Sequence, residues 1–213
     1  MIIPKNWNEI EAKEVGDFTN LTLGGHICKI LDMREYTSEL TGNTSLKVSV
    51  DIDEKSEFDG YFKKQYDNNT SSEKKWPSGA TKYLSLKEEQ TAYLKGFITA
   101  VQHSNPGSKI VVDAGKELDL EQFKNKKIVG VFGWEEYEND KKEVKVATKL
   151  LQFRSLDKLN EIQIPDVKLL NGEYVSVDDY EEYYKDRKNK SIDSKTVSDE
   201  ELHNLLDDTG IEL

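Results

Sequence analysis

Apolar and polar positions alternate along the first part of the chain as they do in β-strands. Residues 25–36 are predicted as a strand, which Gly24 and Gly25 at its start are expected to bend. A turn containing Gly-Asn then leads into residues 45–53, where every second residue is apolar. Residues 58–66, FDGYFKKQY, are predicted as a third strand, and residues 67–85 as a loop.

The spacing of apolar residues changes after this loop. In residues 86–105 they recur every three and four positions, which predicts an amphipathic helix that ends at Asn-Pro-Gly. A short helical turn within 118–127 and two strands, 127–138 and 143–156, complete the predicted body. Three strands, a helix and two strands is the element order of a mainly β, OB-like five-stranded barrel with its helix between strands three and four, although other α+β folds share this order.

The chain divides into three predicted parts. Residues 1–20 form an N-terminal extension, 21–170 the OB-like domain, and 171–213 an acidic, partly disordered tail. The segment from 178 to 195 is charged and has no evident apolar face. A short helix is predicted at 198–207, because Ser198 and Glu201 make a capping box before a small leucine stripe.

Charge is distributed unevenly between these parts. The net charge of the chain is -11, but residues 171–213 hold 13 acidic and 5 basic side chains, so the body is nearly balanced. An anionic ligand is therefore compatible with the body. The absence of a long apolar run or a signal-peptide pattern, and the single cysteine, favour a cytoplasmic protein that does not enter a membrane.

The sequence contains no pattern typical of an active site. The three histidines lack metal-site or triad spacing, and no phosphate-binding glycine loop is present. Glu-x-Lys triplets begin at three positions, as often as chance predicts for this composition. An acidic metal site around Asp51, Asp53 and Glu57 is the remaining enzymatic alternative, and a solvated strand end explains these residues as well. We expect no enzymatic activity, no metal and no cofactor.

Aromatic and basic residues are concentrated between positions 60 and 83 and again on the last two strands. Single-stranded nucleic acid is bound by cations along its phosphates and by flat rings that stack on its bases. The alternative is an ordinary β surface with core aromatics and solvated lysines. The candidate nucleic-acid-binding residues are Tyr61, Lys63, Lys64, Tyr66, Lys74, Lys75, Trp76, Lys82, Trp134, Lys149 and Arg154.

Several segments within residues 1–170 also resemble a family of phage and prophage proteins from Gram-positive hosts. They include LTLGGHICKILDMREYTS, VDIDEKSEFDGYFKKQYDNN, KKWPSG, LKGFITAVQHSN and VGVFGWEEYEND. The family lies in replication and recombination gene modules, and related members are described as single-stranded-DNA-binding proteins. The resemblance thus implies DNA binding without strong sequence preference in the cytoplasm of a bacterial host.

The C-terminal tail is similar to the acidic tips of bacterial single-stranded-DNA-binding proteins, although it ends in Gly-Ile-Glu-Leu and not in Pro-Phe. The similarity implies recruitment of a helicase, primase or recombinase. An adaptor that binds replication proteins and no nucleic acid is the alternative function, and a solubilising tail is the simpler interpretation. The tail residues expected to bind a partner are Asp199, Glu200, Glu201, Leu205, Leu206, Asp207, Asp208, Ile211 and Leu213.

Overall fold

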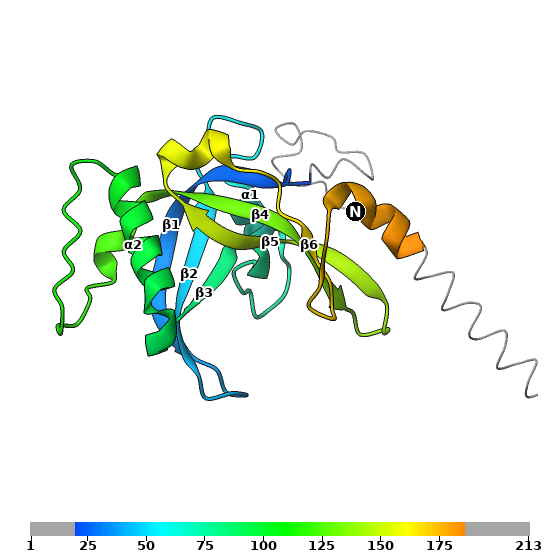
Figure 1. Cartoon of the computed structure of the whole chain (residues 1–213), viewed down its shortest axis with the longest axis horizontal. Coiled ribbons are helices and arrows are strands. Elements are labelled where there is room, and N and C mark those ends of the chain that lie inside the picture. The colour runs from blue at the N-terminus through cyan, green and yellow to red at the C-terminus, as the bar shows by residue number, and fades with distance from the viewer. Residues whose placement is uncertain (1–19, 186–213) are drawn as a thin grey trace, which may run out of the picture.

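The computed structural model describes residues 20–185 and shows a mainly β protein built on one mixed sheet (Figure 1). The sheet has seven strands: β1 (Gly24–Thr37), β2 (Thr44–Ile52), β3 (Thr81–Ser85), β4 (Lys127–Glu138), β5 (Val144–Arg154), β6 (Val167–Lys168) and β7 (Tyr174–Val175). The helices are α1 (Tyr61–Asn68) and α2 (Thr91–Ser104). Short 3-10 turns are η2 (Ser78–Ala80), η3 (Glu88–Gln90), η4 (Glu121–Phe123) and η5 (Leu156–Glu161). No helix in this part of the chain is long and apolar enough to cross a membrane.

The strand order is β3-β2-β1-β4, after which β5 pairs with one edge of β4 and the short β6 and β7 continue from the other. Between residues 20 and 185, no strand pairing joins β3 to β5, so the sheet is open. The turn η2 brings the start of β3 close to β5: a Cβ at Gly79 would lie 2.8 Å from the Thr148 carbonyl oxygen, and Lys149 Nζ donates a hydrogen bond to Ser78 Oγ over 2.8 Å. The mainly β class is confirmed, and a closed five-stranded barrel is not.

The prediction of the third strand is wrong. Residues 61–68 form α1, and the third strand is residues 81–85, inside the predicted loop. Gly60 adopts a left-handed φ of 65°, which turns the chain into the helix, and Asp51 Oδ1 accepts the backbone N–H of Phe62 over 3.0 Å. Phe62 is the buried residue of α1. One buried apolar residue is enough to attach this short helix to the core, so the alternation of apolar and polar residues that a strand would require is not needed here.

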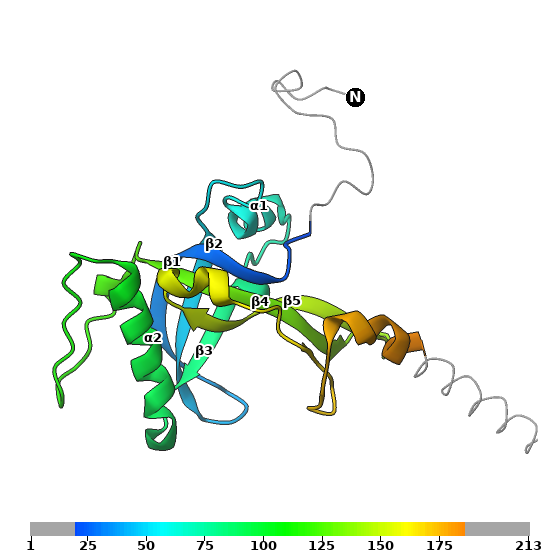
Figure 2. The ribbon, with the colours of Figure 1, turned by 45° about the horizontal axis from the view of Figure 1, so that its top comes forward.

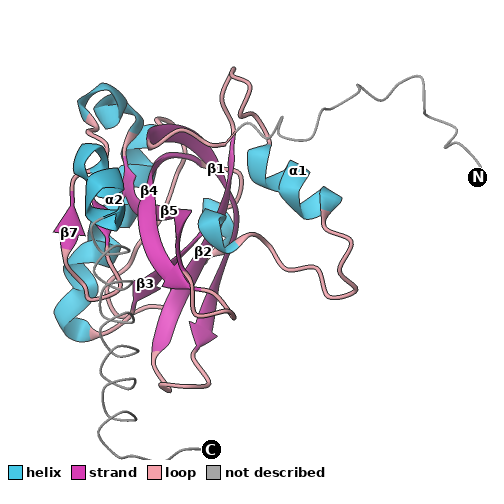
Figure 3. Cartoon of the chain, turned by 90° about the vertical axis from the view of Figure 1, so that its right-hand side faces the viewer, coloured by secondary structure: helices cyan, strands magenta, loops and turns pink. Residues whose placement is uncertain are grey.

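The remaining elements of the body fall close to their predicted ranges. β1, β2, β4, β5 and α2 are confirmed, and η4 is the short turn expected within 118–127. The third and fourth strands still flank α2, as predicted, but α1 is an additional helix between β2 and β3. The sheet encloses its core with the inner faces of β1, β2, β4 and β5, where Ile30, Val48 and Phe132 are fully buried. Figures 2 and 3 show α1 and α2 on opposite sides of the strands, and both contribute phenylalanines to this core.

The first part of the predicted tail is folded onto the hairpin of β4 and β5. After β7, residues 177–185 are helical and lie beside this hairpin, away from α2 (Figure 1). Tyr180 is buried and its hydroxyl donates to Glu136 Oε1 over 2.9 Å, while the Tyr184 hydroxyl donates to the Val144 carbonyl over 3.1 Å. The expectation that residues 178–195 lack an apolar face therefore fails for 178–185, because tyrosines three and four positions apart form one. The helix predicted at 198–207 lies outside the described residues.

Candidate nucleic-acid interface

The outer surface of β1, β2 and β3 carries a group of rings and cations, which we call the tyrosine face (Arg34, Tyr36, Lys47 and Tyr83); Arg34 also pairs with Asp32 at 3.5 Å. Residues directly opposite in antiparallel strands share a face, and Lys47 lies opposite both Arg34 and Tyr83. Leu46 and Val48 point into the core, so Lys47 between them points out. The tyrosine face is therefore a direct consequence of the alternation along β2.

The rings of the tyrosine face contact each other but remain open to solvent. The centroids of Tyr36 and Tyr83 are 5.3 Å apart with planes inclined by 57°, and Lys47 Nζ lies 6.0 Å from the Tyr83 centroid. The two tyrosines are 42% and 47% exposed. Such a pair offers stacking surfaces to flat ligands beside two cations that suit phosphates.

A second group of rings and cations surrounds α1. Tyr66 and Trp76 lie 5.7 Å apart, and Lys74 Nζ is 5.8 Å from the Tyr66 centroid. Trp76 Nε1 donates to the Val50 carbonyl over 3.1 Å, which fixes the half-buried indole beside β2. Six of the predicted binding residues gather here: Lys63, Lys64, Tyr66, Lys74, Lys75 and Trp76. Lys63 is held by Asp67 at 2.7 Å, whereas Lys64 and Lys75 are exposed.

Two predicted rings, Tyr61 and Trp134, have structural contacts. Tyr61 packs against the core and its hydroxyl accepts the Leu21 N–H over 3.3 Å. Trp134 packs against Tyr180, with centroids 6.1 Å apart. Both still line one side of a cleft of about 790 Å³, together with Lys149. Their rings are half-buried, which leaves less surface for stacking than the tyrosine face offers.

Lys82 and Arg154 lie elsewhere, in a groove bounded by β3, β5 and α2, which we call the β3–β5 groove. Its volume is about 670 Å³, and it begins where β3 and β5 separate beyond the η2 contact. Lys158 and His103 also line it, and none of its lining residues is Asp or Glu. Burial lowers the pKa of Lys82; the charge of Glu135 opposes this with a smaller effect, and the charge of Lys168 lowers the pKa slightly further.

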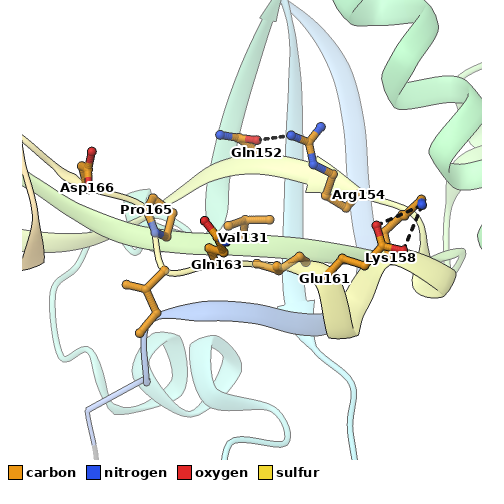
Figure 4. A pocket seen from close by; sticks show the side chains of 10 residues that line it. Val131, Gln152, Arg154, Lys158, Glu161, Gln163, Pro165 and Asp166 are labelled. Atoms are coloured by element: carbon orange, nitrogen blue, oxygen red, sulfur yellow. Dashed lines mark hydrogen bonds and ion pairs between the residues drawn. The ribbon is translucent and has the colours of Figure 1, made fainter.

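A neighbouring pocket on the outer surface of β4 and β5 shares residues with this groove. Figure 4 shows Arg154 donating to Gln152 Oε1 over 2.7 Å, and Lys158 bound to Glu161 at 3.0 Å. Arg154 and Lys158 thus separate the β3–β5 groove from this pocket, whose other wall is the segment from 161 to 166. Lys158 is partly neutralised here by Glu161, while the guanidinium of Arg154 donates to the neutral amide of Gln152.

The structure therefore divides the eleven predicted residues among three places and adds others. Arg34, Tyr36 and Lys47 were missed, although each occupies a polar position of a correctly predicted strand. Alternation along these strands would have found them. Tyr83 was not among the predicted binding residues, because its segment was predicted as a loop and is in fact β3.

Two of the three acidic residues considered for a metal site, Asp51 and Asp53, have other contacts. Asp51 Oδ1 accepts the N–H groups of Ile52 and Phe62, and burial raises its pKa against the effect of these bonds. Asp53 lies 3.9 Å from Lys29 and 3.5 Å from Lys127. Within residues 20–185, no group of three or more His, Cys, Asp or Glu side chains is placed to hold a metal ion.

The residues proposed to bind partners through the tail, from Asp199 to Leu213, lie outside the described residues. No protein-family model matches the chain, and no curated protein matches it either.

Proposed function

We propose that the chain binds single-stranded DNA without strong sequence preference, and that the tyrosine face is the centre of its binding surface. The observation that carries this proposal is the solvent-exposed pair of Tyr36 and Tyr83 with Lys47 beside it. Bases of any identity present a flat face to such rings, so the surface suits an unpaired strand better than a specific duplex. The cluster of Tyr66, Lys74 and Trp76, held beside β2 by the bond to Val50, extends the same kind of surface.

The proposed fold is a partly open OB barrel. The first strand pairs with both the second and the fourth, α2 lies between β3 and β4, and η2 approaches β5 where the ladder is missing. In OB folds the ligand lies across strands two and three and the adjoining loops. β2 and β3 carry Lys47 and Tyr83, so the tyrosine face occupies the corresponding position.

We further propose that the protein acts in phage or prophage replication and recombination, in the cytoplasm of a bacterial host. The resemblance of residues 1–170 to that family supports this role. The acidic residues near the C-terminus support recruitment of a helicase, primase or recombinase through the tail.

Fluorescence anisotropy of labelled oligo-dT, titrated with the full chain at low salt, tests the binding function. The double variant Tyr36→Ala/Tyr83→Ala is expected to lose about 1–3 kcal/mol of binding free energy for each base it no longer stacks. Tyr137→Ala is the matched control, because Tyr137 is 43% exposed on a strand and lies opposite Lys145. Absence of binding by the folded wild-type protein would instead favour an adaptor that binds only proteins.

A further inference from the structure

The β3–β5 groove is a third place where cations and rings meet, apart from the tyrosine face and the cluster around α1. We propose that it binds the continuation of the same single strand. The strand leaves the tyrosine face, crosses the edge of β3 and places its phosphates near Lys82 and Arg154. This inference rests on the proposed DNA-binding function and extends the bound segment to a second surface.

Continuity between the two surfaces is provided by β3. Side chains of Lys82 and Tyr83 leave the strand in opposite directions, so Tyr83 contacts Tyr36 on the outer face while Lys82 faces the groove. Tyr83 also lines the groove, because β3 is the last strand of the sheet on this side. A strand stacked on Tyr83 therefore has the groove directly beside it.

Charge complementarity favours an anionic occupant. The chain has a net charge of -11, yet among the described residues the groove is lined by Lys82, Arg154 and Lys158 and by no Asp or Glu. The ammonium of Lys82 forms no ion pair with a side chain in the described part of the chain, and its burial lowers its pKa. An oxygen of a bound phosphate would accept hydrogen bonds from this ammonium and so replace those to water that it loses on burial.

Rings and backbone groups suit a nucleic acid in particular. Tyr93 on α2 is 76% exposed and Tyr83 is 47% exposed, and both line the groove. Each offers a face to a base, as the tyrosine face does. Because no strand within residues 20–185 pairs with β3 on the side facing β5, backbone N–H groups at this edge are open to phosphate oxygens in the described part of the chain.

The test compares two lengths of labelled oligo-dT, about 6 and about 16 nucleotides, which span most of the range of site sizes known for one OB fold. The short oligonucleotide is expected to occupy the tyrosine face, and the long one to reach the groove. Tyr93→Ala should weaken binding of the long oligonucleotide by about 5- to 150-fold, as expected for one lost stacking contact, and leave the short one unchanged.

A charge variant provides an independent measurement. Lys82→Gln/Arg154→Gln should reduce the slope of log affinity against log salt by about 1.4 for the long oligonucleotide, since each phosphate contact contributes about 0.7. Lys141→Gln/Lys145→Gln removes the same charge from the exposed end of the β4–β5 hairpin and is the matched control. Thermal unfolding of each variant checks that the fold is retained.

Each outcome decides between occupants. Equal losses for both lengths, or no loss for either, would overturn the continuation of the strand into the groove while leaving the tyrosine face intact. If the groove variants bind poly-glutamate more weakly than the wild-type protein does, but bind both oligonucleotides equally well, the groove is a site for an acidic protein and the inference is wrong. Failure of the wild-type protein to bind either length would reject the proposed function itself.

Discussion

Two clusters of aromatic side chains, at opposite parts of the sheet, have opposite fates. Trp134 packs against Tyr180 from the segment after β7, and the Tyr180 hydroxyl donates to Glu136. Tyr36 and Tyr83 contact each other, and nearly half of each side chain remains exposed. A lysine lies near each cluster: Lys149 lines the same cleft as Trp134, and Lys47 lies over the ring of Tyr83. What separates them is whether a later segment of the chain supplies a cover, and this difference assigns one cluster to stability and the other to binding.

The largest expected effect is on the covered cluster. Tyr180→Ala should lower the free energy of unfolding by about 3–5 kcal/mol, because it removes a buried ring and the hydroxyl that donates to Glu136 Oε1. Tyr36→Ala should change it by less than about 1 kcal/mol. Urea unfolding followed by circular dichroism measures both, with hydrogen exchange of residues 167–185 to detect local detachment. Equal losses for the two variants would remove the distinction between the clusters.

An intermediate effect is expected on DNA affinity. Tyr83→Ala alone should weaken oligo-dT binding by about 1–3 kcal/mol, because its ring is exposed for stacking. Trp134→Phe should leave affinity unchanged, since it retains a ring against Tyr180 and its indole faces that tyrosine. Anisotropy titrations at one salt concentration are sufficient. A greater loss for Trp134→Phe would show that the cleft with Lys149, and not the tyrosine face, holds the bases.

The smallest effect is the contribution of a single cation. Lys47→Gln should reduce the salt slope of oligo-dT binding by about 0.7, the value for one phosphate contact with a single strand. Lys145→Gln, which also lies opposite a tyrosine on a strand, should leave the slope unchanged. Titrations at four or more salt concentrations give the slopes, and a reduction by both variants would indicate a diffuse electrostatic effect without a defined face.

The predicted strands succeeded where burial on one side imposes alternation. β2 shows this at Lys47, which faces outward between the buried Leu46 and Val48, whereas Ser49 and Asp51 further along the strand are themselves buried. The third strand was misplaced because β3 is short and its burial does not alternate strongly, whereas the segment of α1 contains rings that imitate a strand. Short edge strands depend on pairing with a neighbour more than on their own pattern, and pairing is not visible locally.

The candidate site was only partly accessible to the same reasoning. Lys74, Lys75 and Trp76 are near Tyr66 in sequence, and α1 keeps them close in space. In contrast, the contact of Tyr36 with Tyr83 joins positions that are far apart in the chain through two strand pairings. Trp134 is covered by Tyr180, which lies in a segment whose many charged residues had predicted disorder. The contact depends on tertiary packing, which the sequence does not show. Local sequence therefore identified candidate rings, but not which of them are left uncovered.

The pairing of β1 with β4 has a consequence for how the chain folds. Their partners, such as Cys28 and Ile128, are about 100 residues apart, whereas β1–β2 and β4–β5 are local hairpins. Local hairpins close quickly and distant pairings slowly, so the sheet is expected to assemble from two halves that meet late. On a ribosome, the half that carries Tyr36 and Tyr83 emerges first. This half has therefore been synthesised, with both tyrosines, before β4 and β5, which later cover its apolar side.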